Sequence, residues 1–94
     1  MRLRWSEAAL KDRDEIFDYI ERDSPQTASE VDVRIREQAR SLRGFPAAGR
    51  PGRVRGTREL VISRTPYIAV YRVRRDEVVI LRVLRGTRSW PGRF

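Results

Sequence analysis

Apolar residues in the first half of the chain recur at the three- and four-residue spacing that is typical of helices. Before them, Arg2 to Trp5 alternates polar with apolar residues and predicts a short strand. Ser6 then serves as the N-cap of a helix from about Glu7 to Arg22. The apolar stripe of this helix consists of Ala9, Leu10, Ile16, Phe17 and Ile20.

A second helix is predicted directly after the first. Ser24 is its N-cap, and Pro25 occupies its first position, where the missing N–H costs nothing. Gly44 and Pro46 end it. Two consecutive amphipathic helices with a short link form an antiparallel hairpin. The apolar residues of the second helix are Ala28, Val31, Ile35, Ala39 and Leu42.

Three strands are predicted in the second half, after an arginine-bearing loop from Gly44 to Gly56. Both faces of the last two strands are largely apolar, which is typical of central strands. The order of elements predicts an α+β fold in one domain, residues 1–94: an N-terminal strand, a two-helix hairpin, then a three-stranded antiparallel sheet with the helices packed on one face. The three strands are Arg58 to Ser63, Tyr67 to Arg74 and Glu77 to Arg85, with a tight turn at Arg75-Asp76.

The composition excludes several classes of function. The 94 residues include no cysteine and no histidine, so disulfides, most zinc sites and histidine-based catalytic triads are excluded. We expect no metal ion and no cofactor. No signal peptide is recognisable, and no apolar run approaches the roughly 20 residues that span a bilayer. A soluble cytoplasmic protein is therefore expected.

Positive charge is concentrated in the second half of the chain. The net charge is +8, and only Lys11 of the 21 basic residues is a lysine. Residues 1–45 contain 9 basic and 10 acidic side chains, whereas residues 46–94 contain 12 basic and 3 acidic ones. Guanidinium groups bind phosphate oxygens bidentately. The asymmetry therefore predicts a surface for a polyanion on the second half of the fold.

A phosphate-binding groove is the function that we infer for the arginines of this half, with a solvated basic rim as the alternative. A nucleotide phosphate loop is excluded, because the glycine pair Gly44 and Gly49 lacks the lysine, the hydroxyl and the preceding strand that such a loop requires. If the last three strands are neighbours, the loop arginines meet those at the end of the final strand. The set is Arg50, Arg53, Arg55, Arg58, Arg64, Arg82, Arg85 and Arg88.

Arg82 interrupts an otherwise apolar strand, where an arginine requires an ion-pair partner or a functional role. Glu59 is a candidate partner. It is also the only carboxylate close in sequence to the arginine set, so it is a candidate general base as well as a strand ion-pair partner.

Three aromatic residues are candidates for stacking on a nucleic-acid base. Tyr71 is expected in the core, and Tyr67 either in the core or against a base. Trp90 lies in a polar tail where its indole has no obvious neighbour, so a surface role is expected for it.

Six sequence blocks spread over the chain form a recognisable pattern. They are Trp5-Ser6-Glu7-Ala8-Ala9, Ile16-Phe17-Asp18-Tyr19-Ile20, Gly49-Arg50-Pro51-Gly52, Gly56-Thr57-Arg58-Glu59-Leu60, Pro66-Tyr67-Ile68-Ala69-Val70-Tyr71 and Val83-Leu84-Arg85-Gly86-Thr87-Arg88-Ser89-Trp90-Pro91. In these blocks the chain resembles the RelE/ParE superfamily of type II toxins, and the resemblance implies the fold above and a cognate antitoxin encoded beside the toxin. It leaves the target open, because RelE-like members cut messenger RNA in the ribosome and ParE-like members poison DNA gyrase.

Two departures from the family pattern bear on the target. Many relatives carry histidine where this chain has Arg85, and ribosome-dependent nucleases carry arginine where it has Ile68. Arginine is not deprotonated in proteins, so Arg85 cannot act as a general base. In a nuclease mechanism, Arg58, Arg85 and Arg88 would neutralise the scissile phosphate and Glu59 would be the base.

Three hypotheses follow. The leading one is ribosome-dependent cleavage of messenger RNA, and the alternative is inhibition of DNA gyrase by protein binding without catalysis. A plain RNA-binding module is the third, although no RNA-module signature is present. The antitoxin is expected to lay an acidic or apolar amphipathic segment over the helix hairpin or the basic groove. In the leading hypothesis the RNA-binding residues are Arg50, Arg53, Arg55, Arg82, Tyr67 and Trp90.

Overall fold

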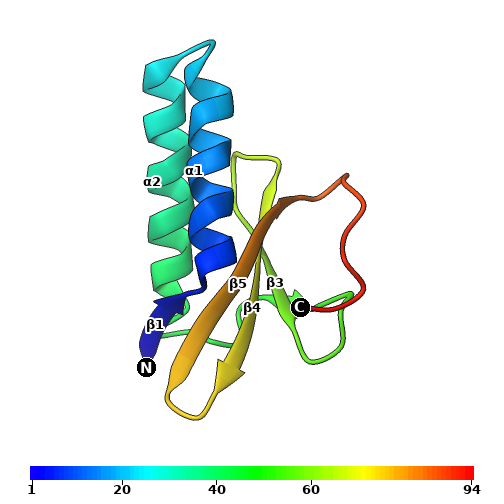
Figure 1. Cartoon of the computed structure of the whole chain (residues 1–94). Coiled ribbons are helices and arrows are strands. Elements are labelled where there is room, and N and C mark those ends of the chain that lie inside the picture. Colours follow the sequence, from blue (N-terminus) through cyan, green and yellow to red (C-terminus); the bar gives the residue numbers. More distant parts are fainter.

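The computed structural model describes residues 1–94 and shows two antiparallel helices packed on one face of a five-stranded sheet (Figure 1). The α+β class, the helix hairpin and the last three predicted strands are confirmed. The elements are β1 (Arg2–Trp5), α1 (Glu7–Glu21), α2 (Pro25–Ser41), β2 (Arg50–Pro51), β3 (Arg58–Val61), β4 (Tyr67–Arg74) and β5 (Glu77–Arg85).

The sheet is larger than the three strands predicted. Its order is β1-β5-β4-β3-β2, with β1 parallel to β5 and the other pairs antiparallel. The pairing of β1 with β5 places Arg2 beside Glu77. These residues are far apart in the sequence, so no pattern of neighbouring residues predicts the contact. The two-residue strand β2 lies beside β3 within the predicted loop and is too short to show an alternating pattern.

Both predicted helix starts are confirmed. The hydroxyl of Ser6 accepts the N–H of Ala9 at 3.0 Å, and that of Ser24 accepts the N–H of Thr27 at 3.1 Å. Ser6 also donates its hydroxyl to the carbonyl of Leu81 at 2.8 Å, which attaches the start of α1 to β5. Neither helix combines the length and the hydropathy needed to cross a membrane.

The core lies between the helix pair and the sheet. Successive residues of β4 alternate between its two faces, and both Ala69 on the helix side and Val70 on the other side are fully buried, as expected of a central strand. Tyr71 is in the core as predicted. Its hydroxyl donates to the Pro46 carbonyl and accepts the Gly49 N–H, both at 2.8 Å, which holds the loop before β2 against the sheet.

Arg82 pairs with Asp12, not with Glu59. Because β1 ends opposite Ile80, the N–H of Val83 lies on an open edge of β5, and the buried Asp12 carboxylate of α1 accepts it at 2.9 Å. The same carboxylate accepts Nε of Arg82 at 2.7 Å and Nη2 at 3.0 Å. The hydrogen bonds to Asp12 raise the pKa of Arg82. The sequence prediction chose the wrong partner because a contact between α1 and β5 depends on how the helix packs.

We expect Asp12→Ala to lower the free energy of unfolding by about 2–4 kcal/mol, because it leaves a partly buried guanidinium and a strand N–H without an acceptor. Urea denaturation of both proteins measures the loss. Asp14→Ala, at an exposed position of the same helix, is the control and should be nearly neutral. Equal stability of the two variants would contradict the assigned role of Asp12.

Candidate functional site

The predicted arginine set divides between the two faces of the sheet. Arg58 and Glu59 are consecutive in β3, so their side chains point to opposite faces. Arg58 lies on the helix side and donates to the carbonyls of Gly49 at 2.7 Å and Ala47 at 3.5 Å. Glu59 lies on the other side. The two residues proposed as phosphate ligand and base therefore do not act at one point.

Glu59 is buried and occupied by two arginines of the loop around β2. The carboxylate accepts Nη2 of Arg50 at 3.0 Å, and the backbone N–H and Nε of Arg53 at 2.7 and 3.2 Å. Only 2% of the Glu59 side chain is exposed, against 54% and 42% of the two arginines. Glu59 is therefore an ion-pair partner, one of the two roles considered for it.

The surroundings of Glu59 keep it ionised. Burial raises its pKa, but the hydrogen bonds from the Arg53 backbone and from the Arg50 and Arg53 side chains outweigh burial, so the pKa lies below the ordinary value of 4.5. A carboxylate with a lowered pKa and occupied oxygens is a poor acceptor for a substrate proton.

Trp90 closes this cluster from the C-terminal segment. The Arg53 guanidinium lies 3.5 Å from the centre of the indole ring, and the indole N–H donates to the Arg85 carbonyl at 2.9 Å. The expectation of an indole without neighbours was wrong, because the segment after β5 turns back toward the β2–β3 loop (Figure 1). We call Arg50, Arg53, Glu59 and Trp90 the Glu59 cluster.

A groove of about 420 Å³ lies on the helix side, between α1 and the end of β5. We call it the α1–β5 groove. Arg85 and Arg88 both line it, but the loop arginines and Arg58 that were expected to meet them do not. Tyr67 is buried in the core and also forms part of the groove wall. Glu15 and Tyr19 of α1 line it too, and sequence reasoning missed both, since only the packing of α1 brings them there. The lining residues are Asp12, Glu15, Ile16, Tyr19, Tyr67, Val83, Leu84, Arg85 and Arg88.

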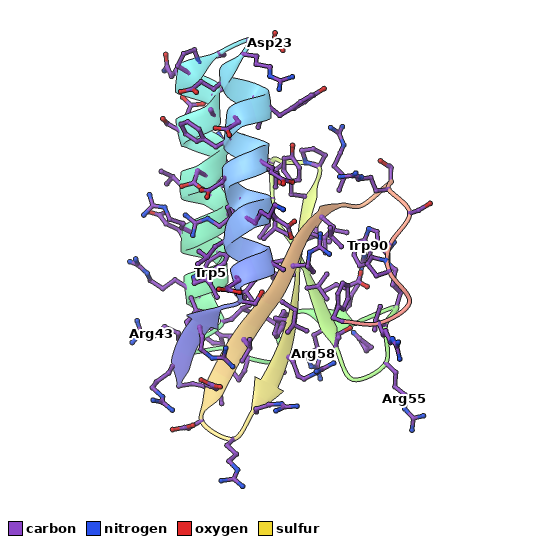
Figure 2. All side chains as sticks on the ribbon, in the orientation of Figure 1. Trp5, Asp23, Arg43, Arg55, Arg58 and Trp90 are labelled. Atoms are coloured by element: carbon purple, nitrogen blue, oxygen red, sulfur yellow. The ribbon has the colours of Figure 1, made fainter.

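The remaining arginines of the set join neither place. Arg82 is held by Asp12. Figure 2 shows Arg55 pointing away from the sheet, below Arg58 and Trp90. Arg64 lies exposed in the β3–β4 turn with a φ of 65°. The predicted common phosphate surface for residues 50–88 is therefore wrong: the arginines form two groups on opposite faces, with others apart.

Comparison with known proteins identifies the family. Residues 3–90 match the model of the ParE toxin of type II toxin-antitoxin systems, parDE. The chain belongs to the ParE toxin family. The protein Y4kP of Sinorhizobium fredii is 48% identical over 90 residues, 96% of this chain and 93% of that protein. A chain of the chromosomal ParDE system from P. aeruginosa superposes with a TM-score of 0.82 and 38% identity, covering 90% of this chain and 95% of that one.

For this ParE-family chain, we expect Glu59→Gln to lower the free energy of unfolding at neutral pH by about 2–3 kcal/mol, because it removes a carboxylate that two guanidinium groups bind. Since the folded pKa lies below the unfolded value, the contribution is complete above pH 4.5 and disappears as pH falls through the folded pKa. Urea denaturation across pH 3 to 8 measures it. Glu37→Gln, at an exposed site, is the control; a deficit of Glu59→Gln that does not shrink in acid would contradict the assignment.

Proposed function

We propose that this type II toxin inhibits DNA gyrase by binding to it, without catalysis. Membership of the ParE family supports the choice of target. The observation that carries the proposal is the separation of the expected nuclease residues: the Glu59 carboxylate lies on the far face of the sheet, while Arg85 and Arg88 line the α1–β5 groove on the helix side. A general base must lie within hydrogen-bond reach of the proton that it removes.

Cleavage of messenger RNA is the second candidate, and one observation favours it. Glu15 lines the groove together with Arg85 and Arg88, so a carboxylate and two cations do share one hollow. Electrostatic stabilisation contributes on the order of 10²–10³ per donor. The Glu15 side chain is 65% exposed, however, and 4.0 Å from Lys11, which is not the desolvated setting of a tuned base.

We expect purified toxin, freed of antitoxin, to inhibit supercoiling by gyrase at micromolar concentration. Messenger RNA in a translation reaction with the same dose should remain intact. Gel mobility of plasmid and mapping of RNA ends provide the two measurements. Glu15→Gln should leave gyrase inhibition unchanged, because no carboxylate chemistry is involved. Cleaved messenger together with unimpaired supercoiling would reject the proposal in favour of the nuclease.

Family membership implies a cognate antitoxin, and we propose that it docks in the α1–β5 groove. The apolar lining from Ile16, Val83 and Leu84 fits one face of an amphipathic segment. Arg85 and Arg88 at the same groove fit acidic side chains of that segment. Tyr19 is 60% exposed at the groove, so its ring is available for the partner to bury.

Tyr19→Ala is expected to weaken antitoxin binding by about tenfold or more, because a buried aromatic residue at an interface typically contributes above 1 kcal/mol. Titration calorimetry with purified antitoxin measures the affinity. Val33→Ala, which also shortens an exposed apolar side chain but on α2, is the matched control and should bind normally. Equal affinities of the two variants would place the antitoxin elsewhere.

A further inference from the structure

A second concentration of arginine lies at the end of the molecule formed by β1, the C-terminus of α2 and the β4–β5 turn. Two neighbouring hollows mark it, one of about 660 Å³ and one of about 400 Å³, and Arg2 lines both. No apolar side chain lines the larger one. We call this surface the basic end; its arginines are Arg2, Arg40, Arg43, Arg74 and Arg75.

The carboxylates at the basic end do not neutralise it. Asp76 lies 3.6 Å from Arg2, with about three quarters of each side chain exposed, and Glu77 pairs with Arg4 at 3.4 Å. The exposed Arg2–Asp76 pair is weak and exchanges readily with other ions. Glu77 is only 23% exposed and is held by Arg4, which is not one of the arginines of the basic end. No carboxylate lies within 4.0 Å of the other four arginines of the surface. Most of the guanidinium groups are thus free to bind a ligand.

The opposite end of the molecule carries acidic residues. The loop between α1 and α2, which contains Asp23, and the β4–β5 turn lie at opposite extremes of the molecule, whose longest dimension is 39 Å (Figures 1 and 2). Asp18 and Glu21 precede that loop at the end of α1, and neither forms an ion pair. Charge separated in this way orients a protein as it approaches a polyanion, with the basic end leading.

We propose that the basic end binds the phosphodiester backbone of duplex DNA. The larger hollow presents guanidinium groups and no apolar side chain, so it matches phosphate oxygens and offers nothing to an apolar protein surface. The choice of DNA over RNA rests on the proposed function, since gyrase holds a DNA duplex. The basic end and the α1–β5 groove share no residue, so antitoxin and DNA would contact different sides of the toxin.

The test measures binding of antitoxin-free toxin to a fluorescein-labelled duplex of about 20 base pairs by anisotropy over a range of salt concentrations. The double variant Arg74→Gln with Arg75→Gly should bind at least about tenfold more weakly at moderate salt, and its log–log salt slope should fall in magnitude by about 1.8. Glycine suits position 75, where φ is 47°.

The matched control is Arg22→Gln with Arg64→Gly. It removes the same charge from exposed sites away from the basic end, and it likewise places glycine at a positive φ, 65° in this case. The control should bind DNA with the affinity of the unmodified toxin. Both double variants should have the same melting temperature as the unmodified toxin. Equal losses of affinity in the two variants would show that only net charge matters and would overturn the inference.

Two further measurements separate this inference from the proposed function. Toxin that inhibits gyrase but shows no salt-dependent DNA binding would overturn the inference and leave the proposed function in place. Toxin that binds DNA through the basic end but leaves gyrase unaffected would support the inference and reject the proposed function. Tighter binding to an RNA duplex of the same sequence would overturn the assignment to DNA.

Discussion

The carboxylate of Asp12 determines where α1 lies against the sheet. Beyond the end of β1, strand β5 has an open edge, and Asp12 accepts both the Val83 N–H on that edge and the guanidinium of Arg82. A buried charge is costly unless every partner is in place, so this contact favours one position of the helix. The same position brings Ile16 and Tyr19 over the end of β5 and thereby forms the α1–β5 groove.

Alternation along the strands distributes the charged residues to separate surfaces. In β3 it sends Arg58 toward the loop before β2 and Glu59 to the far face, where Arg50 and Arg53 bind it. The ion pairs with Glu59 neutralise part of the positive charge of the second half of the chain inside the protein. The groove and the basic end are the two places where arginines available for partners gather, while Arg55 and Arg64 lie exposed apart from both.

Different elements form these two surfaces. The groove combines an apolar floor with arginines at one wall, which suits an amphipathic protein segment. The larger hollow of the basic end contains charged side chains only, which suits a phosphate backbone. A toxin that binds its target rather than transforming it has no need of a tuned acid or base, and the ion-paired state of Glu59 agrees with such a function.

The sequence by itself determined the local elements and the family. Helix spacing, the caps Ser6 and Ser24, and the turn at Arg75-Asp76 depend on neighbouring residues, and all appear in the structure. Only the tertiary structure decided that β1 lies beside β5, that Arg82 pairs with Asp12, and that Arg2 meets Arg74 at the basic end. Those contacts join residues far apart in the chain. Helix packing and strand pairing decide which distant side chains meet, and no local pattern encodes either of them.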